Sequence, residues 1–151
     1  MSTKKVVFRL NEEEYGIDIS EVNTVEKDMV IKRMLKSPNN VKGKTNLRGN
    51  DIPVYSLRRK FGFKDIKPDK NTRHLIISVD EMDIAFEVDQ VKGIIDIEES
   101  NIFDVPEVIK CDNTQYIKSI ANVNGELVLV LDSKFLVDNE ELLALQAKNK
   151  R

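Results

Sequence analysis

The residue types from which catalytic, metal and disulfide sites are built are scarce in this sequence. Its 151 residues include one cysteine, one histidine and no tryptophan. The single cysteine, Cys111, excludes an intrachain disulfide framework, and together with one histidine it cannot supply a Cys/His zinc site. The six glycines are scattered, so no glycine-rich phosphate loop follows a strand. We therefore expect neither a metal nor a cofactor.

Long apolar runs and an excess of one charge are also absent. No stretch approaches the roughly 18 apolar residues that cross a bilayer, and residues 1–5 lead directly into a predicted strand without a secretory apolar region. Charged residues make up 33% of the chain, yet the net charge is only −2, which does not favour nucleic acid or an anionic membrane. We expect a cytoplasmic protein without direct membrane insertion.

Candidate catalytic residues lack the partners that catalysis requires. His74 begins an apolar segment and has no serine or cysteine nearby in a nucleophile motif, so a structural role is the simpler interpretation. Cys111 lies in a polar loop between Lys110 and Asp112, where an incidental thiol is the preferred interpretation. The carboxylates gather in predicted turns, as solvated acids do. We expect no enzymatic activity.

The sequence contains an internal repeat. An offset of 69 residues aligns residues 6–25 with residues 75–94, including an acidic turn in each copy. A second offset, of 76 residues, aligns residues 41–56 with residues 117–132. Self-similarity at this length indicates two copies of one small β unit, each of which is hard to stabilise alone.

Alternating apolar residues in both copies predict a mainly β fold, with tight hairpin turns at Gly49 and at Asn124–Gly125. Small antiparallel units must close or pack to hide their edges, so two fused barrels around a shared core are expected. We predict a single domain over residues 4–138, with barrel-like halves at about 6–66 and 73–138 that can exchange strands at their ends. Residues 139–151 are predicted to form a short peripheral helix, with Glu141 in solvent.

Two basic clusters keep a second class of function open. They lie at Lys32–Lys36 and at Arg58–Lys60, and small barrels often bind nucleic acid. Aromatic residues make up only 6% of the chain, so a platform for base stacking is poorly supplied. A small-barrel nucleic-acid-binding protein therefore remains the alternative interpretation.

The segment Lys42–Gly49 is polar yet bounded by two glycines. One interpretation is an ordinary hairpin whose Arg48 points into water. The other is a partner-binding arginine held on a rigid turn, because arginine forms directional, bidentate contacts. The residues alone leave both interpretations open.

The sequence resembles the CheW family of bacterial chemotaxis coupling proteins. The resemblance covers about residues 6–137 and is carried by two motif groups. The first half contributes Phe8-Arg9-Leu10, Glu14-Tyr15-Gly16-Ile17-Asp18-Ile19, Val41-Lys42-Gly43, Asn46-Leu47-Arg48-Gly49, Ile52-Pro53-Val54 and Phe61-Gly62. The second half contributes Phe86-Glu87-Val88-Asp89-Gln90-Val91, Tyr116-Ile117-Lys118, Gly125-Glu126-Leu127-Val128 and Leu131-Asp132.

The resemblance implies two five-stranded barrels of the SH3 type and the function of an adaptor without catalysis. Such an adaptor couples the cytoplasmic tips of chemoreceptors, the methyl-accepting chemotaxis proteins, to the regulatory domain of the histidine kinase CheA, and it joins membrane receptor arrays through these partners. At 151 residues the chain has no room for a fused kinase or receiver domain, so we expect the stand-alone adaptor. The residues implied to contact the receptor are Val22, Thr24, Val25, Gly43, Asn46, Leu47 and Arg48. Those implied to contact the kinase are Ile84, Phe86 and Ile120.

The chain departs from the family pattern at a few positions. The family commonly has two apolar residues where Lys44 and Thr45 stand, and an acid where Thr24 stands. It also has proline near Met34 and usually aspartate at Ser56. These departures concern the implied receptor-facing surface rather than the fold.

Overall fold

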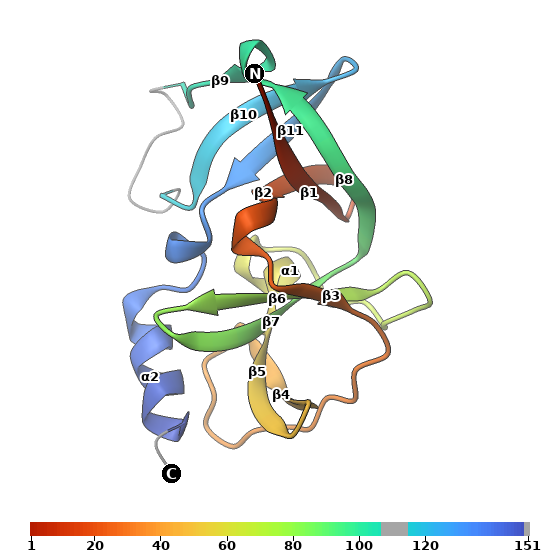
Figure 1. The fold of residues 1–151 in the computed structure, drawn as a ribbon. Coiled ribbons are helices and arrows are strands. Elements are labelled where there is room, and N and C mark those ends of the chain that lie inside the picture. Colours follow the sequence, from red (N-terminus) through yellow and green to blue (C-terminus); the bar gives the residue numbers. More distant parts are fainter. Residues whose placement is uncertain (107–114, 150–151) are drawn as a thin grey trace.

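The computed structural model describes residues 1–106 and 115–149, and strands dominate it (Figure 1). The strands are β1 (Ser2–Leu10), β2 (Glu13–Asp18), β3 (Thr24–Glu26), β4 (Val41–Leu47), β5 (Asn50–Ser56), β6 (Arg73–Val79), β7 (Met82–Val88), β8 (Gln90–Glu98), β9 (Ile102–Phe103), β10 (Ile117–Val123) and β11 (Glu126–Leu131). Two helices, α1 (Leu57–Lys60) and α2 (Asn139–Asn149), and the short 3-10 turns η1 (Ile19–Glu21), η2 (Glu99–Asn101) and η5 (Ser133–Phe135) complete the described elements.

The strands form two sheets with the same internal order. Sheet A runs β8-β1-β2-β11-β10-β9, and sheet B runs β3-β6-β7-β5-β4. The repeat offsets convert one order into the other, because β8, β1, β2, β11 and β10 are the copies of β3, β6, β7, β5 and β4. In both sheets the central contact is a parallel pair, β2 with β11 and β5 with β7. The predicted mainly β fold with two barrel-like sheets and a short C-terminal helix is confirmed.

Each sheet combines strands from both halves of the chain. The β1–β2 hairpin of the first half completes sheet A, whose other strands come from the second half. The β6–β7 hairpin of the second half completes sheet B in the same way. The boundary between the barrels therefore does not follow the halves 6–66 and 73–138, because a whole hairpin is exchanged in each direction.

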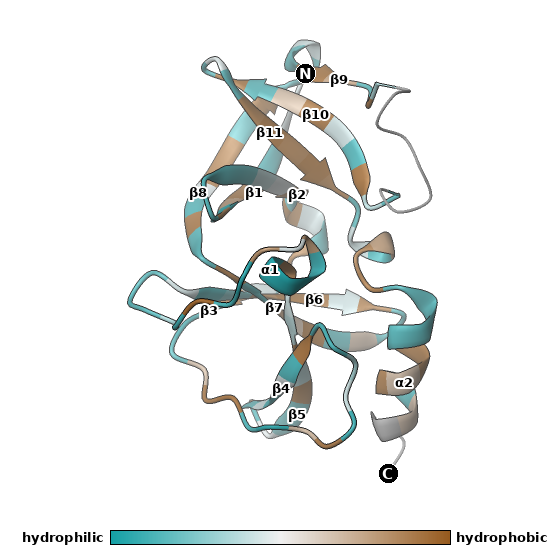
Figure 2. Cartoon of the chain, turned by 180° about the vertical axis from the view of Figure 1, so that it is seen from behind, coloured by the Kyte–Doolittle hydropathy of each residue, from teal (hydrophilic) through white to brown (hydrophobic). Residues whose placement is uncertain are grey.

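The apolar residues form three clusters. Sheet B encloses a small one around Val54 and Ile76, and sheet A encloses another around Val128 and Val130. The largest cluster lies between the two sheets and takes fully buried side chains from both, including Phe8, Ile17, Tyr55, Leu75 and Phe86. The apolar strand β11 shows as a brown band in Figure 2. The shared core between the sheets is the reason that two small barrels form one body.

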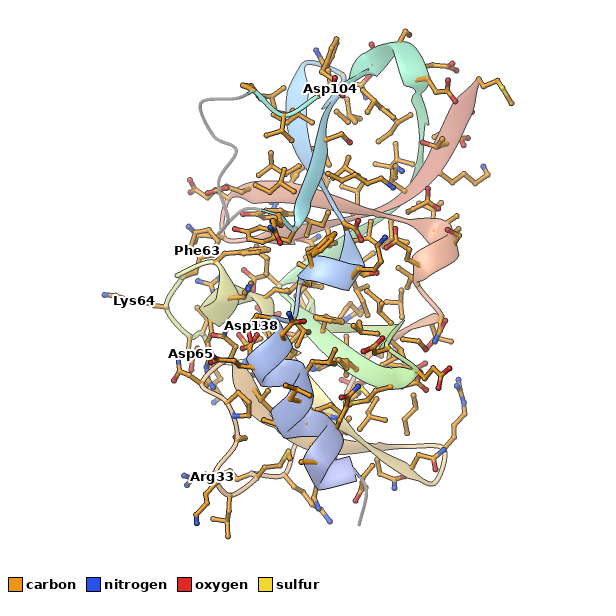
Figure 3. All side chains as sticks on the ribbon, turned by 90° about the vertical axis from the view of Figure 1, so that its left-hand side faces the viewer. Arg33, Phe63, Lys64, Asp65, Asp104 and Asp138 are labelled. Atoms are coloured by element: carbon orange, nitrogen blue, oxygen red, sulfur yellow. The ribbon has the colours of Figure 1, made fainter. Side chains whose placement is uncertain are left out.

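Helix α2 is held more firmly than the sequence predicts. It lies beside sheet B with its first residues at the centre of the molecule, where Figure 3 labels Asp138. Asp138 Oδ1 accepts a hydrogen bond from the N–H of Glu141 (2.8 Å), and Glu141 Oε1 accepts one from the N–H of Asp138 (3.1 Å), which is a capping box. The hydroxyl of Tyr55 donates to the same Oε1 (2.7 Å). Glu141 is therefore buried rather than solvated, and this corrects the prediction.

Candidate functional site

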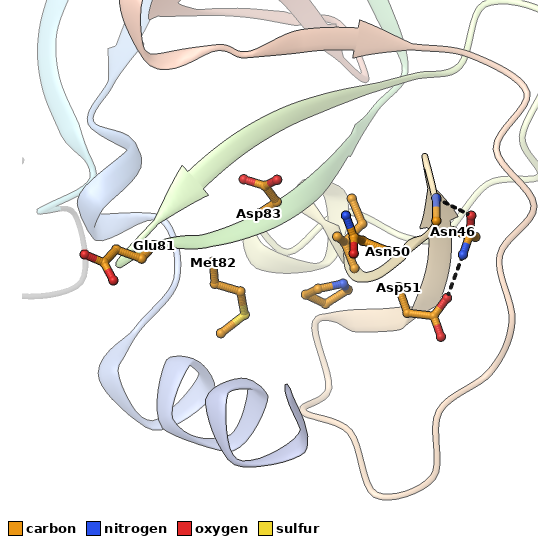
Figure 4. Close-up of a pocket in the computed structure, with 9 residues that line it drawn as sticks. Asn46, Asn50, Asp51, Glu81, Met82 and Asp83 are labelled. Carbon is orange, nitrogen blue, oxygen red and sulfur yellow. Dashed lines mark hydrogen bonds between the residues drawn. The ribbon is translucent and has the colours of Figure 1, made fainter. Parts of the chain in front are cut away.

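The β4–β5 hairpin ends in a two-residue turn made by Arg48 and Gly49. Both have positive φ, 50° and 91°, as a type I′ turn requires. Asn46 supports the turn, because its Oδ1 accepts from the N–H of Gly49 (3.1 Å) and its Nδ2 donates to Asp51 Oδ1 (3.3 Å), as drawn in Figure 4. The Arg48 side chain is 69% exposed, so the hairpin presents a guanidinium to solvent.

Arg48 also links the two edges of sheet B. Its Nη2 lies 3.6 Å from Oε2 of Glu26, the last residue of the edge strand β3. Of the other predicted β3 residues, Val25 is exposed, whereas Thr24 faces inward opposite Ile76. Among the described residues the Thr24 hydroxyl is buried without a hydrogen-bond partner. The structure thus brings Arg48 to the strand β3 through Glu26, leaves Val25 of that strand exposed and buries the Thr24 hydroxyl.

Gly43, predicted as a receptor contact, has a structural role in the loop that precedes β4. A Cβ atom at this position would lie 2.1 Å from the carbonyl oxygen of Lys32. The glycine lets residue 32 pair with residue 44 through two backbone hydrogen bonds of 2.8 Å. Thr45 fixes the same loop, because its buried hydroxyl donates to the carbonyl of Val30 (2.7 Å). Gly43 therefore positions the surface that its neighbours present.

The docked loop and the β4–β5 hairpin enclose the largest of the described pockets, about 640 Å³. It is lined by Glu26, Lys27, Asp28, Met29, Val30, Lys32, Lys44, Thr45, Asn46, Leu47 and Asp51. Leu47 is half-buried against the interior of sheet B and forms part of the floor. A second, more polar pocket lies on the other side of the hairpin, towards the β6–β7 turn, and carries Asp51, Glu81 and Asp83 (Figure 4).

The edge strands β3 and β8 of the two sheets expose apolar side chains at equivalent places in the repeat. Val25 on β3 is 43% exposed and Ile94 on β8 is 59% exposed, and the offset of 69 residues relates them. Val22 and its copy Val91 are half-buried and pack against the shared core. The family resemblance implies receptor contact for Val22 and Val25 but assigns no role to their repeat copies Val91 and Ile94.

The predicted kinase contacts are not brought together. Ile84 and Phe86 on β7 of sheet B are fully buried in the shared core, so their side chains are not accessible to a partner. This corrects their assignment as contact residues. Ile120 lies on β10 of sheet A, opposite Phe103 of β9. Phe103 is 53% exposed, and Leu127 on β11 is 65% exposed. Ile120 thus belongs to an apolar patch with Phe103 and Leu127. The alternation of residues along the strands does not show that these three side chains lie together.

His74 takes part in a buried ion-pair cluster. Its Nε2 lies 3.1 Å from Oε2 of Glu87, whose Oε1 accepts from Lys42 Nζ at 2.7 Å. Burial favours the neutral form of Glu87, but hydrogen bonds from His74 and Lys42 outweigh it and lower the pKa. The repeat places Lys5 and Asp18 at the equivalent positions of sheet A, where they also pair (3.0 Å). The cluster is therefore a cross-strand support that both sheets contain.

The described part of the chain contains no candidate metal site. No group of three or more His, Cys, Asp or Glu side chains in residues 1–106 and 115–149 could hold a metal ion. Cys111 lies outside the described residues. No described helix is long and apolar enough to cross a membrane.

The two arginines of the basic cluster Arg58–Lys60 form ion pairs within the molecule. Arg58 pairs with Asp89 and donates to the carbonyl of Lys64 (2.7 Å). Arg59 forms hydrogen bonds with both carboxylate oxygens of Asp65 (2.9–3.2 Å), on the loop labelled in Figure 3. These contacts leave little of the charge that nucleic-acid binding uses.

Comparison with known proteins agrees with this geometry. The family described as CheW-like domain matches residues 4–141 of the chain. Chemotaxis protein CheW of Helicobacter pylori is 36% identical over 124 residues, which cover 82% of this chain and 74% of that protein. Chemotaxis protein CheW of Bacillus subtilis is 28% identical over 137 residues, which cover 91% of this chain and 88% of that protein.

A solved structure is also similar. The crystal structure of scaffolding protein TtCheW from Thermoanaerobacter tengcongensis matches with a TM-score of 0.84 and 33% sequence identity. The match covers 93% of this chain and 96% of that one. The likeness therefore extends over nearly the whole chain.

Proposed function

The chain belongs to the CheW family of chemotaxis scaffold proteins, and from this premise we propose that it couples chemoreceptors to the histidine kinase CheA. It forms no bond and turns over no substrate in this role. It holds two binding surfaces at a fixed separation, so that the state of the receptor biases the state of the kinase. Its place is the cytoplasm, at receptor arrays that it joins through these partners.

The receptor-binding surface is centred on Arg48. The observation that carries this assignment is the exposed guanidinium on a turn fixed by Asn46 and Gly49, next to the edge strand β3 that carries Glu26 and the exposed Val25. An amphipathic receptor helix can place apolar side chains against Val25 and a polar group against the guanidinium. Arginine at a rigid position is the kind of residue that dominates binding energy.

The kinase-binding surface is centred on Ile120 of sheet A. Phe103 and Leu127 extend it, because Phe103 lies directly opposite Ile120 and Leu127 lies on the neighbouring strand of the same outer face. This patch is at the β9–β11 end of the molecule, whereas the Arg48 turn is at the β4–β5 end (Figure 1). Separate ends of one rigid body allow both partners to bind together.

Isothermal titration against a receptor cytoplasmic fragment and against the CheA regulatory domain tests the proposal. We expect both to bind, and Leu127→Asp to weaken only the kinase domain, since a carboxylate is introduced into an apolar contact. Ile66→Asp is the matched control, because Ile66 is also an exposed apolar residue (46%) but lies in the linker between β5 and β6. Failure of the unmodified chain to bind either partner contradicts the proposal.

A further inference from the structure

Two lysines oppose each other at the rim of the largest described pocket. Residues 32 and 44 form an antiparallel bridge in which each N–H donates to the other's carbonyl, both at 2.8 Å. Side chains directly opposite in such a pair leave the backbone on the same face, and both lysines line the same pocket. Like charges in this arrangement destabilise the fold.

Specific residues hold residue 32 in place opposite residue 44. Gly43 admits the carbonyl of Lys32, and Thr45 fixes Val30 through its buried hydroxyl. Of the neighbouring carboxylates, Glu26 pairs with Arg48 (3.6 Å), whereas Asp51 lies 3.7 Å from Lys44 and offsets part of its charge. No described carboxylate forms an ion pair with Lys32, whose residue is exposed. Lys27 and Asp28, adjacent in sequence and both exposed, are the remaining charges of the pocket.

We propose that Lys32 and Lys44 form a two-lysine site that binds a carboxylate side chain of the receptor segment docked beside Arg48. The inference rests on the proposed receptor binding and adds the chemistry of the bound segment, which must be acidic at this point. A carboxylate between two ammonium groups relieves their repulsion, so the site is most favourable when occupied. Lys44 is a position where the family resemblance implies an apolar residue.

Lys32→Glu separates a binding role from a structural one. The substitution places a carboxylate opposite Lys44, so the free protein should melt at an unchanged or higher temperature. Affinity for the receptor fragment should fall roughly tenfold, and its dependence on salt should become weaker. Lys64→Glu, at an exposed lysine labelled in Figure 3 on a different loop, is the matched control and should change neither quantity. Unchanged receptor affinity of Lys32→Glu overturns the inference.

A second measurement keeps the site testable if the receptor itself does not bind. Amide NMR spectra of the unmodified chain are titrated with a hexaglutamate peptide and, separately, with a short single-stranded oligothymidylate. Shifts centred on residues 30–32 and 44–46 with the peptide alone support a carboxylate site. Equal shifts with the oligonucleotide, or shifts spread over the whole surface, overturn it. Absence of receptor binding together with localised peptide shifts contradicts the adaptor proposal but not the lysine site.

Discussion

At the scale of single residues, the repeat shows which side chains the fold itself prefers. The turn residue Arg48 has φ 50°, and its copy in sheet A, Asn124, has φ 52°. Asparagine tolerates this left-handed region, whereas residues with long side chains are uncommon there. The turn conformation therefore favours asparagine at position 48, and an arginine kept there at some cost in stability is consistent with the proposed role in binding.

Arg48→Asn should consequently change stability and binding in opposite directions. The free energy of unfolding should stay the same or rise by up to about 1 kcal/mol, because the turn gains its preferred residue. Receptor affinity should fall at least roughly tenfold, since truncating a central interface arginine typically costs about 2 kcal/mol or more. Denaturant titration and calorimetric binding measure the two effects. The reciprocal Asn124→Arg should lower stability slightly and leave receptor binding intact.

Tyr55 and Glu141 provide a second test at this scale. The Tyr55 ring is fully buried, its hydroxyl pKa is raised by burial, and its proton is donated to Glu141. Tyr55→Phe should lower the free energy of unfolding by about 1–3 kcal/mol, because a buried carboxylate loses a donor. Tyr15→Phe is the comparison, since Tyr15 donates to the exposed Glu13 and its loss should cost less. Equal losses in the two variants would contradict a special role for the Glu141 contact.

Asp18 predicts the behaviour of the protein in acid. A hydrogen bond from the Ser20 N–H, with further help from the Ser20 hydroxyl and Lys5, lowers the pKa of Asp18 from 3.8 to about 2. A carboxyl whose pKa is depressed on folding stabilises the native state above its unfolded pKa. This stabilisation should be lost as pH falls from about 4 to about 2, and Asp18→Asn should show a smaller loss across that window. Chemical denaturation at a series of pH values measures it.

At the scale of elements, the loop before β4 and the helix α2 make more tertiary contacts than their sequence patterns indicate. The loop lacks periodicity, so the sequence gives no sign that residue 32 pairs with residue 44. The capping box at Asp138 and Glu141 can be recognised from spacing, but the burial of Glu141 depends on Tyr55, which is distant in the chain. Contacts of this kind follow from tertiary packing and could not be predicted from local pattern.

Gly43→Ala should therefore disturb the receptor-binding surface without unfolding the protein. A methyl group at this position meets the backbone of Lys32, which has to move away. We expect the bridge to residue 44 to be lost, amide exchange to accelerate at residues 30–32, and receptor affinity to fall. Gly125→Ala is the control, because a Cβ there meets no atom within 4 Å, although its φ of 86° still carries strain. Retained protection of residues 30–32 in Gly43→Ala would contradict this account of the loop.

Removal of α2 should be costly, contrary to the expectation of a peripheral helix. Leu145 is 2% exposed in the shared core, and Glu141 joins Tyr55 and Asn40. Truncation after Asp138 should lower the melting temperature markedly. Leu143→Ser, at a residue of the same helix that is 66% exposed, should leave it nearly unchanged. A truncated chain as stable as the full one would show that these contacts contribute little.

At the scale of the whole molecule, the exchanged hairpins bind the two halves into one folding unit. The alternation of apolar residues was sufficient to predict the strands and the duplicated hairpins, because it is a local property. It could not predict that β2 pairs in parallel with β11, or β5 with β7, because partner choice depends on long-range packing. For the site, the family resemblance implied Arg48, and the structure places its side chain in solvent, whereas Ile84 and Phe86 are not accessible because residues 84–86 of β7 are buried on both faces.

A single cooperative unfolding transition follows from this exchange. Neither sheet can form without a hairpin from the other half, so calorimetric and van 't Hoff enthalpies should agree. A fragment ending before residue 70 should not fold alone. It would lack β8 to β11 of sheet A and the β6–β7 hairpin of sheet B. Two resolved transitions, or an independently folded fragment, would contradict the account.

The central claim is that one chain binds receptor and kinase at the same time through opposite ends. Sedimentation velocity of the chain mixed with a receptor cytoplasmic fragment and the CheA regulatory domain, separately and together, tests it most directly. We predict a species that contains all three components, from which Arg48→Asn removes only the receptor fragment and Leu127→Asp removes only the kinase domain. Mutual displacement of the two partners, or loss of both with either variant, would contradict the claim.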